Sequence, residues 1–278
     1  MSEALSSPQR ILVALDGSPQ SRAALDAAVR LAVALEAEIE GLFVEDEQLL
    51  RAAQLPFATE VRAYTAPPKR LSGDRMQRQL RRQAGHAERA LRRAAGPEEV
   101  PHTFRTAQGD VTQELRRAAD GADLLVLGKT STASSRRRLG STCQALLRDA
   151  PSPVLVVRTP VPPRTPLLVY YDGSAAAEAA LRLATRLARQ AEGTALDVLL
   201  PASDAAETDR LREQIRARDD TAEVPVRLHV LPRAERRRLS AFARDGGLVL
   251  LPAGCPPLGG TSLQQFLYEI DRPVLVVR

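Results

Sequence analysis

Two glycines bound a loop whose residue types suit the binding of a phosphate group. Gly128 follows the apolar segment 124–127, and Gly140 directly precedes the hydroxyl residues Ser141 and Thr142, which open a predicted helix. Backbone N–H groups at a helix N-terminus favour an anion, and hydroxyl groups can donate hydrogen bonds to it. The pattern is typical of a phosphate-binding loop, and equally typical of an ordinary exposed loop between a strand and a helix.

Charged side chains near this loop extend the candidate site. Lys129 and Arg136–Arg138 lie within the loop and would add positive potential. Asp16 ends the apolar segment 11–15, which the sequence predicts to be a strand. In open α/β sheets, ligands bind beyond the carboxyl ends of the strands, where the strand order reverses. We therefore expect a ligand site at the carboxyl edge of a sheet.

Other reactive residue types form no recognisable site. His86, His102 and His229 share no metal-binding spacing and are interpreted as solvated or core residues. Cys143 lies just inside a predicted helix, where a small packed thiol is the favoured interpretation. Asp16 lacks the acidic cluster that a phospho-accepting aspartate needs. Because no nucleophile, base and orienting group occur together, we expect no enzymatic turnover.

The elements that would position these residues alternate between strands and helices. Unbroken apolar segments such as 154–157 suit parallel strands that are buried on both faces. Alternating elements imply right-handed crossovers and an α/β fold with a doubly wound parallel sheet. In the first half, the expected strands are Ile11–Leu15, Glu38–Val44, His102–Ala107, Ala122–Leu127 and Val154–Val157, and the expected helices begin at Pro19, at Arg75 and after Asp110.

The chain contains an internal repeat. The segment Ile11–Ser18 reads ILVALDGS, and Leu167–Ser174 reads LLVYYDGS. A second pair follows in the same order, because Pro153–Arg158 and Pro273–Arg278 both read PVLVVR. Two matched pairs in one order predict two copies of the same α/β unit.

The repeat divides the chain into two tandem Rossmann-like domains. The first covers 1–158 and contains an insertion at about 45–74, whose prolines indicate an excursion over the surface. A proline-rich linker at 159–166 leads to the second domain, 167–278. The insertion could cover the ligand site as a lid or fill it, and both alternatives stay open at this point.

Four features follow one another in the first half. They are Asp16 after the first strand, Val44 at the end of the second, the loop that ends in Gly140-Ser141-Thr142, and the closing PVLVVR segment. In this order they resemble the universal stress protein family, in its tandem form. The resemblance implies domains of the adenine-nucleotide alpha hydrolase-like type, which form an intramolecular pseudo-dimer through their closing strands. It also implies a stress-response sensor or adaptor.

The resemblance gives each candidate residue a role. Asp16 would hydrogen-bond the adenosine part of ATP or another adenine nucleotide, and the backbone of Val44 would contact the adenine. The phosphates, with Mg²⁺, would lie against the loop, and any ATP hydrolysis would be slow and incidental. The residues of this loop are Gly128, Lys129, Ser131, Gly140, Ser141 and Thr142.

The loop departs from the family pattern at one position. Ser131 stands where members that bind ATP have a second glycine, and fewer residues separate it from Gly140. If that position needs a positive φ, a side chain there costs about 1 kcal/mol.

The second half departs further from the pattern. It keeps Asp172 and the segment Gly260-Thr261-Ser262. However, Pro252, Pro256 and Pro257 each remove an N–H group that a phosphate cradle would use. We interpret this half as degenerate and as a structural partner of the first.

Composition and charge suggest a different class of function. The 278-residue chain has a formal net charge of +5, and Lys69 and Lys129 are its only lysines. Nucleic-acid binding is judged unlikely, because arginine richness also follows from a GC-rich genome and because the charge is spread over several helices. The most basic helix face is either solvated or a docking surface for an acidic partner; it contains Arg75, Arg78, Arg81, Arg82, Arg89, Arg92 and Arg93.

The remaining expectations concern location and partners. No apolar segment approaches the ~18 residues of a membrane span, and residues 1–10 lack an apolar signal core. Cys143 and Cys255 make no disulfide framework. We expect a soluble, cytoplasmic protein with unknown protein partners, as a monomer or a homodimer of the tandem chain. The alternative function is a nucleotide-independent scaffold in which both pockets are vestigial.

Overall fold

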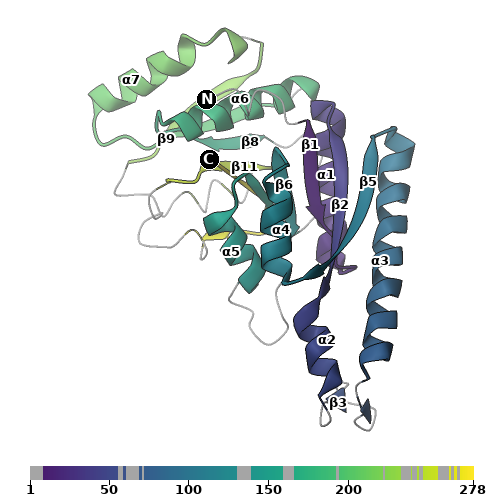
Figure 1. Ribbon diagram of the computed structural model, residues 1–278. Coiled ribbons are helices and arrows are strands. Elements are labelled where there is room, and N and C mark those ends of the chain that lie inside the picture. Colours follow the sequence, from purple (N-terminus) through teal and green to yellow (C-terminus); the bar gives the residue numbers. More distant parts are fainter. Residues whose placement is uncertain are drawn as a thin grey trace.

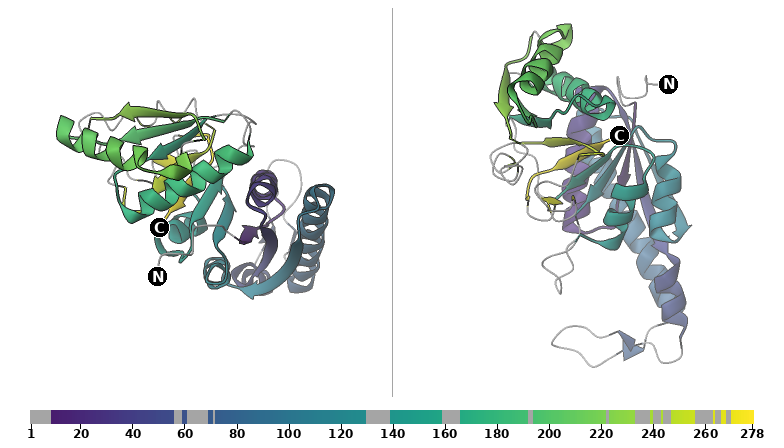
Figure 2. Two further views of the ribbon diagram at one scale, coloured as in Figure 1. Left: turned by 90° about the horizontal axis from the view of Figure 1, so that it is seen from above. Right: turned by 90° about the vertical axis from the view of Figure 1, so that its left-hand side faces the viewer.

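The structure, a computed structural model, describes residues 9–55, 59–60, 69–70, 72–129, 139–158, 166–191, 194–221, 223–232, 247–255 and 270–278, and also residues 239, 243, 263, 266 and 267. In this part of the chain, ten strands form one sheet with helices on both faces (Figure 1, Figure 2). The first half contributes β1 (Arg10–Ala14), β2 (Glu38–Asp46), β5 (His102–Gly109), β6 (Leu124–Gly128) and β7 (Val154–Val157). The second contributes β8 (Leu167–Tyr170), β9 (Leu196–Leu200), β10 (Val226–Val230), β11 (Val249–Pro252) and β12 (Val274–Val277).

The strand order confirms the doubly wound fold. The strands lie in the order β10-β9-β8-β11-β12-β7-β6-β1-β2-β5. All neighbours are parallel except β7 and β12, which are antiparallel. In each half the chain winds outward from the first strand, then returns to its other side. The strand order therefore reverses between β1 and β6, and again between β8 and β11.

The two halves join where their identical closing segments pair. Leu155 lies opposite Leu275, and Val156 lies opposite Val274. All four side chains are buried. A second contact crosses between the halves, because Arg186 donates to the carbonyl oxygen of Leu35 at 2.9 Å. The expected intramolecular pseudo-dimer is confirmed, and its halves contribute jointly to the core on each face of the sheet.

Helices cover both faces of this sheet. One core cluster lies under α1 (Pro19–Leu35), α3 (Gly73–Ala95), α6 (Ala175–Gln190) and α7 (Ala205–Arg216). A second cluster lies on the opposite face, under α4 (Val111–Ala119) and α5 (Ser141–Asp149) (Figure 1). Both clusters contain residues of both halves. Among the described helices, none is long and apolar enough to span a membrane.

The repeated Asp-Gly-Ser segment builds the same helix start in both halves. Ser18 caps α1 by accepting a hydrogen bond from the N–H of Ser21 at 3.1 Å, and Ser174 caps α6 in the same way. Gly17 and Gly173 have φ angles of +79° and +78°, which favour glycine because it has no Cβ. The glycine and the serine of the motif are therefore explained by local backbone geometry.

The predicted insertion contains regular structure. It holds α2 (Glu47–Gln54) and a two-stranded hairpin of β3 (Thr59–Glu60) and β4 (Lys69–Arg70). These elements and the first turns of α3 project from the body of the molecule as an arm (Figure 1, Figure 2). Leu50 and Ala53 of α2 are buried, and α2 packs against α3. A packed helix pair and a short hairpin therefore form the described part of the arm.

Candidate functional site

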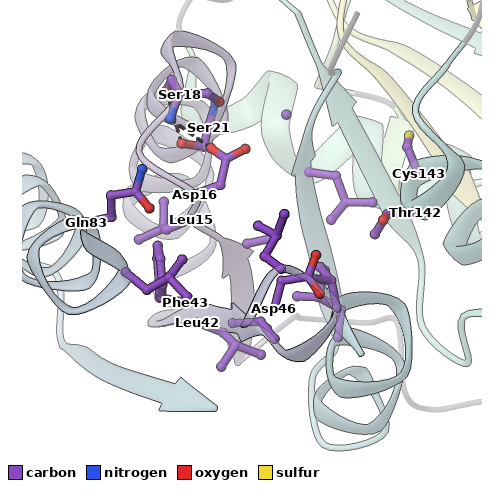
Figure 3. A pocket seen from close by; sticks show the side chains of 18 residues that line it. Leu15, Asp16, Ser18, Ser21, Leu42, Phe43, Asp46, Gln83, Thr142 and Cys143 are labelled. Atoms are coloured by element: carbon purple, nitrogen blue, oxygen red, sulfur yellow. Dashed lines mark hydrogen bonds between the residues drawn. The ribbon is translucent and has the colours of Figure 1, made fainter. Parts of the chain in front are cut away.

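A cavity of about 340 Å³ opens at the carboxyl ends of β1, β2 and β6. It lies where the strand order reverses, which is the expected ligand position of such a sheet. Figure 3 shows Asp16 and Gln83 on one side of the cavity and Thr142 across from them. Most of the lining is apolar, and its polar residues are Asp16, Ser18, Ser21, Asp46, Gln83 and Thr142.

Asp16 lies at the cavity wall and is exposed. Its Oδ1 atom accepts a hydrogen bond from the N–H of Ser18 at 2.8 Å, which closes the turn into α1. A carboxylate has several acceptor sites on its two oxygens. Asp16 can therefore hold the turn and still accept a hydrogen bond from a ligand hydroxyl.

The end of β2 forms an apolar wall. Leu42, Phe43 and Val44 line the cavity in succession. Strand side chains alternate between the two faces of the sheet, so Leu42 and Val44 lie on one face and Phe43 on the other. Val44, expected at the adenine position, thus lies where a flat apolar ring could contact strand backbone.

Gly128 has a packing role that the sequence pattern did not indicate. A Cβ atom at this position would lie 2.7 Å from the carbonyl carbon of Gln20 and 2.8 Å from the nitrogen of Ser21. The end of β6 therefore approaches the backbone of α1 so closely that only glycine fits. The absence of a side chain also keeps this part of the cavity wall open.

The far wall of the cavity comes from the start of α5. Gly140 is the N-cap residue, Ser141 is the first helical residue, and Thr142 lines the cavity. Thr112 of α4 lies beside it, with its hydroxyl donating to the Thr142 hydroxyl at 3.4 Å. Ser131 and Arg136–Arg138 lie outside the described residues.

Lys129 does not have the predicted role in the loop. The residue is 5% exposed, and its Nζ donates to the carbonyl oxygens of Leu267 and, at 3.1 Å, of Ile270. Both acceptors belong to the second half of the chain. Burial, followed by the positive charge of Arg158, lowers the pKa of Lys129 to about 8. The amine joins the two halves, and its charge is not directed at the cavity.

Replacing this lysine tests its joining role. Lys129→Met is expected to lower the free energy of unfolding by about 1–2 kcal/mol, because two carbonyl oxygens lose their donor. Between pH 8 and 10.5 the unfolded chain binds this proton and the folded chain does not, so this group stabilises the fold increasingly as pH rises. The difference in the free energy of unfolding between the parent and the variant should therefore widen from about pH 8 to 10. Denaturant unfolding measures this difference. If the free energies of unfolding of the parent and the variant change in parallel with pH, the joining role of Lys129 is contradicted.

Cys143 also lines the cavity but is not a reactive thiol. The side chain is buried, and burial raises the thiol pKa to about 12, against a smaller lowering effect of Lys129. The thiolate, which is the nucleophilic form, is therefore scarce at neutral pH. The interpretation of Cys143 as a packed thiol is supported.

The arm supplies cavity residues that sequence reasoning missed. Asp46 and Leu49 come from the start of α2, and Leu80 and Gln83 come from α3. Asp46 caps α2 by accepting from the N–H of Gln48 at 2.8 Å. An acidic residue before an apolar helical segment was the available signal for this helix start. The described part of the insertion thus lines the cavity and leaves it open.

The second half differs at the positions equivalent to the cavity wall. Strand pairing places Tyr170 at the position of Ala14, Pro201 at that of Val44, and Pro252 at that of Gly128. Tyr170 is 1% exposed, so its ring fills space that alanine leaves open in the first half. Both prolines lack an N–H group.

Asp172 keeps the turn of its counterpart. Its Oδ1 accepts from the N–H of Ser174 at 3.0 Å. The segment Gly260-Thr261-Ser262 lies outside the described residues. The retained aspartate is thus accounted for by the turn that leads into α6, without a ligand.

An open doubly wound sheet with a cavity at its reversal point is the architecture of a Rossmann-like α/β protein. The model of the universal stress protein family matches residues 8–158, more than half of the chain. The chain therefore belongs to the universal stress protein family. A comparison with curated proteins found no match.

A solved structure that matches almost the whole chain shows the same fold. A universal stress protein from Archaeoglobus fulgidus DSM 4304 is 18% identical, with a TM-score of 0.72, and the match covers 96% of this chain and 97% of that one. Two shorter members each match about half of this chain. Universal stress protein UspA from Lactobacillus plantarum is 26% identical over 55% of this chain and 99% of its own, with a TM-score of 0.42. A universal stress protein in complex with cAMP is 24% identical over 55% and 99%, with a TM-score of 0.40.

Proposed function

We propose that the first half binds an adenine nucleotide in the cavity beside Asp16, and that the bound state changes the surface presented to protein partners. The observation that carries the proposal is the open cavity at the β1–β6 reversal point with a carboxylate at its wall. Its volume of about 340 Å³ lies within the usual range for small-molecule sites. The protein would act as a sensor or adaptor without turnover.

Each wall of the cavity suits one part of such a ligand. The apolar segment Leu42–Val44 would contact the base, and Asp16 would accept a hydrogen bond from a ribose hydroxyl. The N-terminus of α5 with Thr142 would receive a phosphate. Within the described residues, no group of three His, Cys, Asp or Glu side chains could hold a metal ion. Mg²⁺ would therefore arrive with the phosphates of the ligand.

The second half would serve as a structural partner. The Tyr170 ring would occupy the base side of its site, and Pro201 would remove the strand N–H that lies at the Val44 position. One ligand for each chain is expected.

Thermal unfolding with and without millimolar ATP–Mg²⁺, cAMP or adenosine tests the proposal. A ligand at a hundred times its dissociation constant should add about 2.7 kcal/mol to the free energy of unfolding. Asp16→Asn keeps the acceptor for the Ser18 N–H but weakens the acceptor for a ribose hydroxyl. This variant should therefore show a smaller rise in melting temperature with ligand, which we call the shift. Asp172→Asn makes the same change in the second half and should leave the shift intact.

Two outcomes would contradict the proposal. No shift with any of the three ligands, in a folded parent protein, would favour the nucleotide-independent scaffold. An equal loss of the shift in Asp16→Asn and Asp172→Asn would show that the site is not confined to the first half.

A further inference from the structure

The outer face of α3 carries a straight row of arginines. At 3.6 residues per turn, five of its arginines fall within about 60° of one another around the helix axis, and at 1.5 Å per residue they span about 27 Å. All five are exposed. We call this row the arginine stripe; it consists of Arg75, Arg78, Arg82, Arg89 and Arg93.

The stripe faces away from the body of the protein. The buried residues of α3 lie on the opposite side of the helix, centred on Leu80, Ala84 and Leu91. Figure 1 and Figure 2 show α3 at the outer margin of the molecule, beside the edge strand β5. A partner of extended shape can therefore reach the whole stripe.

Several arginines elsewhere on the described surface pair with carboxylates. Arg117 is paired with Glu114 at 2.5 Å, and Arg51 with Glu47 at 2.7 Å. On the stripe, Arg89 bonds to His86 at 3.1 Å, and within the described residues the stripe arginines have no carboxylate partner. Helix α3 has seven arginines and two carboxylates, a difference of +5, which equals the formal net charge of the whole chain. The helix thus presents on one outward face five of the arginines that lie close together in residues 75–93.

The chemistry of the stripe favours a polyanion over an acidic protein. Protein interfaces depend on buried apolar or aromatic anchors. Among the described residues, the exposed large apolar side chains are Val33, Leu49, Leu55 and Val230, and none lies on α3. Isolated surface ion pairs contribute only about 0–1 kcal/mol each. Charge alone is sufficient where the partner releases condensed counterions, as duplex nucleic acid does.

We propose that the arginine stripe binds the phosphate backbone of duplex DNA without sequence specificity. Duplex DNA carries one negative charge for about every 1.7 Å of its axis, so about 27 Å of duplex presents enough phosphates for all five guanidinium groups. Arginine suits this task because its planar fork can contact phosphate oxygens in pairs. The absence of stripe aromatics gives single-stranded bases nothing on which to stack. The proposal does not depend on the cavity of the first half.

Fluorescence anisotropy of a labelled duplex of about 24 base pairs, measured between about 50 and 200 mM salt, tests the proposal. The stripe variant replaces all five arginines by glutamine. A matched control removes the same charge from exposed helix positions elsewhere, with Arg30, Arg116, Arg148, Arg210 and Arg216 each replaced by glutamine. Glutamine is a good helix former, and thermal unfolding should confirm that both variants fold.

Five phosphate contacts predict a slope of log K against log salt that is steeper by about 4.5 in the parent than in the stripe variant. The stripe variant should also bind the duplex at least about tenfold more weakly. The control should keep the slope of the parent to within about 0.9, which is the contribution of one phosphate contact. Equal losses in both variants would assign any binding to overall charge and overturn the proposal. So would a parent that fails to bind the duplex, or that binds inorganic polyphosphate or polyglutamate but not DNA.

Discussion

Ala14→Tyr is expected to abolish the thermal stabilisation of the protein by adenine nucleotide. The substitution gives the first half the residue that the second half has at the equivalent position, Tyr170. Ala14 lines the cavity, and Tyr170 is buried against the corresponding strands. A ring at this position would occupy the space that the ligand needs. A shift of about 5–10 °C in the parent, corresponding to about 2.7 kcal/mol, should fall to near zero.

Two further variants make this result interpretable. Ala14→Ser adds a single oxygen and should keep most of the nucleotide shift. Tyr170→Ala should cost about 3–5 kcal/mol of stability by leaving a cavity in the second half, yet it should leave the shift unchanged. A folded Ala14→Tyr protein with the full shift would place the ligand elsewhere.

Gly128→Ala is expected to destabilise the protein more than a surface glycine substitution would. The new Cβ would meet backbone atoms of Gln20 and Ser21 at 2.7–2.8 Å, and backbone cannot rotate away as a flexible side chain can. Overpacking of this kind costs about 1–3 kcal/mol, and the upper end is expected here. The melting temperature should fall by about 5–10 °C. Because α1 must shift, the positions of Ser18 and Ser21 at the cavity should also change.

Gly96→Ala is the matched control for this prediction. Gly96 has helical φ and ψ angles of −60° and −47°, and nothing lies within 4 Å of the Cβ that alanine would add. This substitution should be neutral or stabilise by up to about 1 kcal/mol. Equal melting temperatures for Gly128→Ala and the parent would show that β6 and α1 can separate without cost.

Part of the candidate site could be predicted from residue order alone. Asp16, Val44 and Gly128 each end an apolar strand segment, and in a doubly wound sheet such ends converge at the carboxyl edge. Their convergence on one cavity follows from this rule. Leu49, Leu80 and Gln83 could not be predicted as cavity residues, because their place depends on how α2 and α3 pack against each other and against the carboxyl end of the sheet.

Lys129 shows the limit of reading charge from sequence. A lysine inside a glycine-bounded loop suggested a phosphate contact, yet its amine is buried against carbonyl oxygens of the second half. Such contacts join residues more than a hundred positions apart in the chain. Local spacing carries no information about them.

The sequence by itself determined the repeat and the alternation of strands and helices. These features depend on periodicity and on identical local patterns, which each segment carries within itself. Only the tertiary structure decided that Gly128 packs against α1, that Tyr170 fills the second site, and that the Lys129 amine joins the two halves. Each of these depends on distances between elements that are remote in sequence, and those distances exist only once the sheet has closed and the helices have packed against it.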